Sequence, residues 1–172
     1  MAVIASFLIG RNGASTLGGI SSPLSTPADR ARFLARHRSA GAFIIGKKSA
    51  AIESYENSAQ PVFVFTRTRE KLEFPHPSMQ QITVRDDLSE ITRLLDQRIE
   101  GDIVVEAGAE LLLAMLKTGA ISQLELTISP IDGDGHFVSE EELLQHFNSV
   151  EEVNIEGTRL LKCRNEGDSP NS

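Results

Sequence analysis

Apolar residues occur along this chain in two patterns that alternate with one another. Continuous apolar runs rich in β-branched and aromatic residues fall at positions 2–9, 42–45, 61–66 and 103–105. Runs of this kind are typical of strands buried on both faces of a sheet. Between them lie segments whose apolar residues recur every three or four positions, the spacing of one helix face. The chain is therefore predicted to alternate strands with helices.

The segment 26–39 carries the signals of a helix. Thr26 can cap its N-terminus, Pro27 suits its first turn, and Gly41 is expected to end it. Most of its arginines are expected on a solvated face, although some could touch an anionic ligand. The preceding residues 11–25 are rich in Gly, Ser and Thr and predict a long loop. Such a loop either lines a functional site or is a mobile connection, and both interpretations stay open.

Two capping boxes predict further helices. Asp87 with Glu90 precedes a segment with apolar residues at helical spacing, and Ser139 with Glu142 precedes a short segment that runs to Phe147. In each pair the first side chain can accept a hydrogen bond from a free N–H group of the first turn.

The C-terminal third contains signals of strands. Residues 122–129 alternate apolar and polar side chains, so one face of this strand is expected to be solvated. Residues 153–163 offer one or two strands broken by Gly157, with Cys163 half-buried at the end. Residues 165–172 are polar and predict a disordered tail.

This order of elements predicts an α/β fold with a mostly parallel central sheet and antiparallel C-terminal strands. At 172 residues the chain is expected to form one domain, residues 1–164, followed by the tail.

Composition narrows the class of protein. The net charge of −7 argues against general binding to nucleic acid or to a membrane surface. A single cysteine excludes an internal disulfide framework and suits a reducing compartment. The N-terminal apolar run is too short for a membrane span and has no basic segment before it, so the cytoplasm is the expected location. The four histidines lack metal-ligand spacing, and no metal site is predicted.

The stretch that follows the strand 103–105 has the form of an anion site. Glu106 stands at the end of the strand, and Ala107, Gly108 and Ala109 make a turn of small residues before a helix that begins at Glu110. Free N–H groups at such a helix start can bind phosphate. An ordinary turn that binds nothing is the alternative.

A second candidate site follows the strand 61–66. Thr66 ends this strand, and Arg67 comes directly after it. In a parallel sheet, ligands gather at the carboxyl ends of the strands, and a guanidinium group can bind phosphate oxygens with two hydrogen bonds. Solvated loop charge is the alternative.

Three segments resemble one known family, the reductase domain of the riboflavin biosynthesis proteins. They read GISSPLSTPADR at residues 19–30, AFIIGKKS at residues 42–49 and VVEAGAELLLAMLKTGAISQLELTISP at residues 104–130. Their order and spacing match those of the family. The resemblance implies a three-layer fold like that of dihydrofolate reductase.

The resemblance also implies an activity. It is the NADPH-dependent reduction of a small-molecule substrate, a ribosylaminopyrimidine whose ribosyl group becomes ribityl by hydride transfer. The homologous positions imply that Ser21, Arg38 and Glu106 contact the substrate. They imply that the cofactor is bound by Gly46, Ser49, Thr66, Arg67, Gly108, Ala109 and Glu110. A homodimer is implied as well.

The chain departs from the family pattern mainly at substrate positions. An acidic residue of the family is replaced by Leu8 or Ile9, an aromatic residue is replaced by Pro23, and the family arginine aligns with His37, one place before Arg38. Two interpretations therefore remain. The protein is either an NADPH-dependent reductase, whose substrate can differ from that of the family, or a non-catalytic relative that serves binding or assembly.

Overall fold

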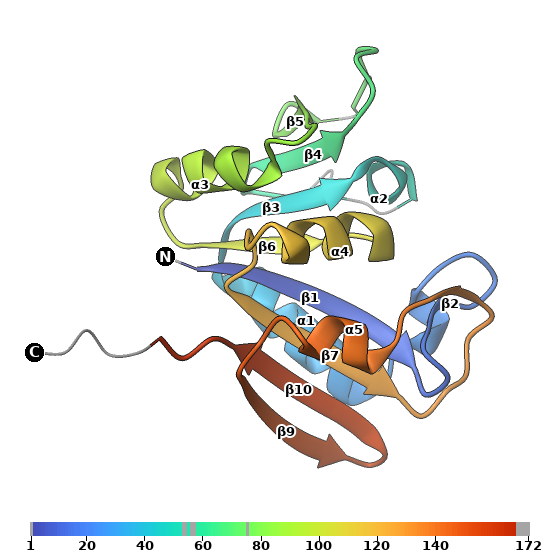
Figure 1. Cartoon of the computed structure of the whole chain (residues 1–172). Helices are drawn as coiled ribbons and strands as arrows, with labels where there is room; N and C mark the ends of the chain where they lie inside the picture. Colours follow the sequence, from blue (N-terminus) through green and yellow to red (C-terminus); the bar gives the residue numbers. More distant parts are fainter. Residues whose placement is uncertain (1, 53–54, 56–57, 75, 168–172) are drawn as a thin grey trace, which may run out of the picture.

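A mixed sheet runs through the whole molecule (Figure 1). The computed structural model describes residues 2–52, 55, 58–74 and 76–167. Among these residues, eight strands form one sheet. In spatial order they are β5 (Met79–Thr83), β4 (Val62–Thr66), β3 (Ala40–Gly46), β6 (Asp102–Glu106), β1 (Val3–Gly10), β7 (Gln123–Ser129), β10 (Thr158–Arg164) and β9 (Ser149–Ile155). The first six run parallel, and β10 is antiparallel to both of its neighbours.

Helices lie on both faces of this sheet, which confirms the predicted α/β class. In Figure 1, α3 (Leu88–Arg98), α4 (Ala109–Lys117) and α5 (Glu140–Leu144) lie in front of the sheet and α1 (Pro27–Ser39) lies behind it. The short α2 (Lys47–Ile52) directly follows β3. The main core fills the space under α3 and α4, where Leu112 and Met115 pack on strand residues such as Ala5 and Leu126. Burial of these apolar side chains is the dominant stabilising contribution.

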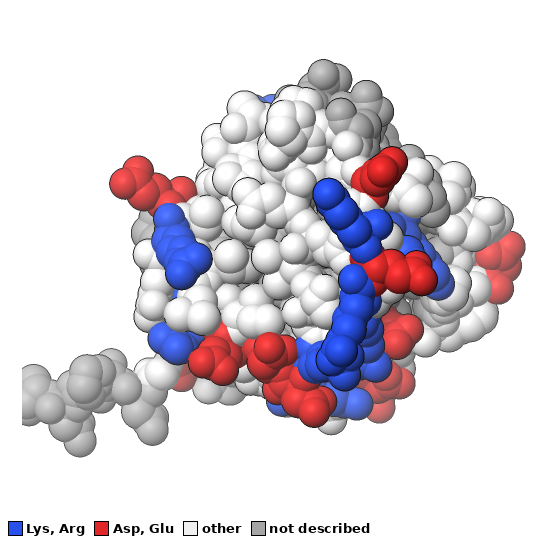
Figure 2. Space-filling view, turned by 90° about the horizontal axis from the view of Figure 1, so that it is seen from above, with Lys and Arg blue, Asp and Glu red and all other residues white. Residues whose placement is uncertain are grey.

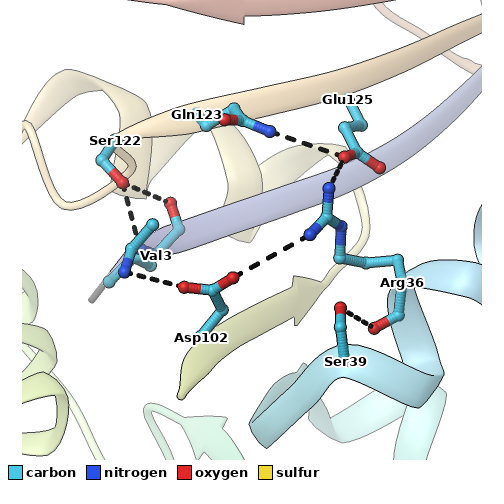
Figure 3. Close-up of polar contacts among 8 residues, drawn as sticks. Val3, Arg36, Ser39, Asp102, Ser122, Gln123 and Glu125 are labelled. Carbon is cyan, nitrogen blue, oxygen red and sulfur yellow. Dashed lines mark hydrogen bonds and ion pairs between the residues drawn. The ribbon is translucent and has the colours of Figure 1, made fainter.

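The opposite face of the sheet is polar beneath α1, and here the prediction of a solvated face on residues 122–129 is wrong. Glu125 is 5% exposed and Thr127 is 2% exposed, because α1 covers them. Arg36 forms an ion pair with Glu125 and lies 3.9 Å from Asp102 (Figure 3). Arg32 donates hydrogen bonds to Thr127 Oγ1 and to the carbonyl oxygen of Leu161. These two arginines are therefore not on the solvated face predicted for them.

The loop predicted at residues 11–25 contains regular structure. Its strand β2 (Ala14–Thr16) pairs with β8 (Gly135–Phe137), which was not predicted, and a short 3₁₀ helix follows at Ser22–Leu24. Asp134 accepts a hydrogen bond from the Gly18 backbone. The partner strand lies more than 100 residues away in sequence, so no local pattern predicts this pairing.

Two of the three predicted helix caps form the expected hydrogen bond. The hydroxyl of Thr26 accepts a hydrogen bond from Asp29 N, and that of Ser139 accepts one from Glu142 N, so both predicted caps are confirmed. Asp87 is the N-cap residue of α3, as predicted, but the expected side-chain cap is absent, because its carboxylate accepts a hydrogen bond from Arg85 N instead.

Gly41 does not end α1, because it lies inside β3 at a register shift. A Cβ atom there would lie 2.1 Å from the carbonyl oxygen of Glu100, so the glycine permits a close approach of two backbones.

The C-terminal segment forms a hairpin of two strands, β9 and β10, around the turn at Gly157 (φ +88°). The helix before it ends at Leu144, earlier than predicted. Cys163 is fully buried rather than half-buried. Asn165 and Glu166, predicted to start the disordered tail, hydrogen-bond to Asn148, and residues 168–172 of that tail lie outside the described residues.

Candidate functional site

A cleft of about 1270 Å³ opens at the carboxyl ends of β3, β4 and β6. Gly46, Thr66 and Glu106, the last residues of these three strands, all line it. The other walls come from α1, from the start of α4 and from the segment 15–25. The carboxyl edge of a parallel sheet is the usual place for a ligand in an open α/β fold. Residues 15–25 of the predicted loop 11–25 therefore line the candidate site, so that the first of the two interpretations of this loop applies to them.

One wall is the N-terminus of α4. Gly108 is its N-cap residue, and among the described residues no side chain caps this end. The first N–H groups of a helix have no intrahelical partners, so those of α4 are available to an anion. Gly108 has φ −67°, and a Cβ atom there would meet nothing within 4 Å among the described residues. The space beside Gly108 is therefore open, and the glycine is not required by backbone strain.

Basic side chains also line the cleft. Arg67 was predicted here, whereas Lys47, Lys48 and Arg85 were not. Lys47 and Lys48 come directly after Gly46, so their position after a strand was a signal in the sequence. Figure 2 shows basic and acidic side chains mixed on the side of the molecule toward which the strands run. Guanidinium and ammonium groups of this kind can bind phosphate oxygens.

A buried carboxylate, that of Glu106, lines the cleft. Glu106 is 8% exposed, and its two oxygens contact two side chains of the protein. Oε1 contacts His37 Nε2, and Oε2 accepts a hydrogen bond from the hydroxyl group of Tyr55. Within the described residues, Glu106 neither caps α4 nor pairs with an arginine.

The imidazole of His37 is held by aromatic rings. Its centroid lies 4.2 Å from that of Phe33 and 4.7 Å from that of Phe43, and Phe43 packs in turn on Tyr55 at 6.0 Å. The guanidinium carbon of Arg30 lies 5.4 Å from the ring centroid of Phe33, within cation–π distance. His37 and Tyr55 were not predicted as site residues, because the segments that carry them lie far from Glu106 in sequence.

Nine of the ten predicted site residues line this one cleft, and Arg38 does not. The lining ones are Ser21, Gly46, Ser49, Thr66, Arg67, Glu106, Gly108, Ala109 and Glu110. Arg38 is exposed on α1, and the preceding residue His37 faces the cleft in its place. Leu8 lines the cleft, whereas Ile9 belongs to the core. The position at which the family has an acidic residue is therefore apolar here.

Two further properties bear on the class of site. Within the described residues, no three His, Cys, Asp or Glu side chains are grouped to hold a metal ion. The described helices include none that is long and apolar enough to cross a membrane.

Comparison with solved structures places the fold among dihydrofolate-reductase-like proteins. A protein assigned to riboflavin biosynthesis from Shewanella sp. PV-4 superposes with a TM-score of 0.69 at 16% identity, over 96% of this chain and all of that one. Dihydrofolate reductase from Enterococcus faecalis, complexed with NADP(H), superposes with a TM-score of 0.65 at 13% identity, over 96% and 97% of the two chains. The predicted dihydrofolate-reductase-like fold is thus confirmed.

A bifunctional riboflavin enzyme has the same fold in part of its length. It is the diaminohydroxyphosphoribosylaminopyrimidine deaminase/5-amino-6-(5-phosphoribosylamino)uracil reductase of Thermotoga maritima, with a TM-score of 0.66 and 16% identity. The match covers 95% of this chain and 56% of that protein, so this chain spans about half of its length. No protein-family model matches the sequence, and no curated protein matches it either.

Proposed function

We propose that this protein is an NADPH-dependent reductase that converts the ribosyl group of a pyrimidine ribosylamine into a ribityl chain. The observation that carries this proposal is the cleft at the ends of β3, β4 and β6, which brings nine of the ten predicted site residues together. Comparison with the riboflavin and dihydrofolate reductases supports the same class of reaction through the shared fold.

The residues present fit the cofactor. The open N-terminus of α4 at Gly108 would accept the pyrophosphate, and Arg67 beside Thr66 would bind the 2′-phosphate of the adenosine. Gly46 and Ser49 would line the path between them. The bound cofactor supplies a hydride, while the protein binds, orients and excludes water.

The substrate end of the cleft would be formed by Ser21 and the ring cluster around His37. Where the family has an acidic residue, this chain has Leu8 or Ile9, and Leu8 is the one that lines the cleft. This difference favours the second candidate, a non-catalytic relative that binds nucleotide or another molecule without turnover. We retain the reductase, because hydride transfer requires orientation more than a dedicated nucleophile.

The reductase proposal is tested with purified protein, NADPH and 5-amino-6-(5-phosphoribosylamino)uracil. Consumption of NADPH is followed by absorbance, and the ribityl product is identified by mass spectrometry. We expect one ribityl product per NADPH oxidised. NADPH binding without product indicates the non-catalytic relative or a different substrate.

The resemblance supports two further proposals. The protein would act in the cytoplasm, where NADPH is supplied, and would form a homodimer. Light scattering after size-exclusion chromatography tests the second. A monomeric mass at working concentration contradicts it.

A further inference from the structure

The imidazole of His37 is restrained on three sides. Nε2 contacts the carboxylate of Glu106, and the rings of Phe33 and Phe43 pack against the imidazole with tilts of 37° and 43°. A carboxylate at Nε2 requires that nitrogen to carry the hydrogen, which fixes the neutral tautomer. Within the described residues, Nδ1 has no hydrogen-bond partner, and the side chain is 28% exposed and lines the cleft.

Glu106 is arranged to hold the imidazole rather than to meet a substrate directly. Each of its oxygens already contacts a protein side chain, His37 or Tyr55, and the carboxylate is 7% exposed. The same relation of carboxylate to imidazole orients the general acid–base group of many hydrolases.

We propose that His37 is the general acid of this cleft and that Glu106 and Tyr55 are its positioning residues. The proposal rests on the reductase function given above and names its proton donor. As hydride from the reduced nicotinamide forms a bond to the anomeric carbon, the bond from that carbon to the ribose ring oxygen breaks. Its electron pair goes to the oxygen, which takes the proton from His37 Nδ1. The nicotinamide is oxidised, the sugar is reduced, and water returns the proton to the imidazole.

Groups from β6, β3, α1 and the segment after α2 surround His37. Glu106, at the end of β6, contacts the imidazole of His37. Tyr55, which follows α2, contacts the same carboxylate. β3 contributes only the uncharged ring of Phe43. On α1, Arg36 turns away toward Glu125 and Asp102, and Arg30 lies over the ring of Phe33 that packs on His37. Among these groups, the imidazole is the one that ordinarily changes charge near neutral pH.

The first test measures single-turnover reduction of 5-amino-6-(5-phosphoribosylamino)uracil by the NADPH-loaded protein. In the unmodified protein the rate should fall as pH rises through the range in which an imidazole loses its proton. His37→Asn should lower the rate at neutral pH by about 10²–10⁴-fold, the usual contribution of a general acid, and remove this pH dependence. NADPH affinity and melting temperature should stay near those of the unmodified protein.

Two other variants separate positioning from structure. Glu106→Gln should lower the rate and shift its pH profile while NADPH affinity is kept, whereas a purely structural carboxylate would lower the melting temperature alone. His76→Gln is the matched control, because His76 lies outside the cleft and hydrogen-bonds to Ser78. A His37→Asn protein that is folded and reduces the pyrimidine at the normal rate overturns the proposal.

The second test does not depend on turnover. In ¹⁵N NMR spectra, neutral His37 should carry its hydrogen on Nε2, and Glu106→Gln should change that signal while His76 is unaffected. A neutral His37 protonated on Nδ1, or a signal unchanged by Glu106→Gln, overturns the proposal. If the protein binds NADPH but leaves this pyrimidine unreduced, the proposed substrate is contradicted and this measurement decides on His37 by itself.

Discussion

At the scale of single residues, Gly108 offers the sharpest test of the phosphate site. Because its φ is −67° and the space around it is open, a larger side chain can be accommodated in the fold. Gly108→Val should therefore fold, with only a small fall in melting temperature because valine is a poorer N-cap residue than glycine. It should weaken NADPH binding at least about tenfold, or about 1.4 kcal/mol, because its methyl groups would occupy the space of the phosphate oxygens. Fluorescence titration measures the affinity, and normal binding by the folded variant would show that the turn is structural only.

Cys163 is a residue whose environment has a measurable effect on stability. Burial raises the pKa of this thiol to about 11 from its ordinary 9.0, with Arg32 opposing the rise and Glu140 adding to it. The folded state thus favours the neutral thiol, and the resulting stability is present below pH 9 and lost as pH rises toward 11.

The loss is on the order of 2 kcal/mol and is tested by denaturant unfolding of the unmodified protein and of Cys163→Ala at several pH values. The difference in unfolding free energy between the two proteins should shrink between pH 9 and 11. A difference that is constant across this range contradicts the assignment.

At the scale of elements, α1 contacts the polar face of the sheet through charged groups. None of its described residues is buried, and Arg32 and Arg36 hydrogen-bond to Thr127 and Glu125 of β7. Burial lowers the pKa of Arg32, while Glu125 and Asp29 oppose this effect. Helices usually dock through an apolar stripe, so this interface depends on charge pairing to an unusual degree.

The Arg36–Glu125 pair makes that dependence testable. The two side chains are 19% and 6% exposed, so removing one partner leaves a charge poorly solvated. Glu125→Leu should destabilise the protein by about 3 kcal/mol, and adding Arg36→Met should recover most of this loss. Denaturant unfolding of the two single variants and the double variant measures the coupling. A double variant no more stable than Glu125→Leu alone would show that the pair does not dock the helix.

Several of these elements could be predicted from sequence. The apolar runs predicted the central strands, and Thr26 and Ser139 predicted two helix starts, because these signals act within a few residues. The alternation of apolar and polar residues along the strand that contains Glu125 wrongly predicted a solvated face. Such alternation shows that one face is polar, but it cannot show whether a helix covers that face. The pairing of β2 with β8 also escaped prediction, because it joins distant parts of the chain.

At the scale of the whole molecule, the cleft is assembled from segments spread from Ser6 to His136. The resemblance predicted nine of its residues, and all of these except Ser21 lie at the end of β3, β4 or β6 or within a few residues after it. The contact between His37 and Glu106 could not be predicted, because it depends on how α1 lies across β6. The fold therefore brings the open helix start at Gly108 and the imidazole of His37, which the sequence keeps apart, into one cleft.

A fluorescence titration of the protein with NADPH and, separately, with NADH tests the proposed nucleotide site and the reductase function together. We predict saturable binding of both, with NADPH bound at least about tenfold more tightly, and loss of most of this preference in Arg67→Ala. A charge-assisted contact to the 2′-phosphate is worth about 1.5–3 kcal/mol, which sets the size of the preference. Equal affinity for the two nucleotides would contradict the role of Arg67, and the absence of saturable NADPH binding would contradict the reductase itself.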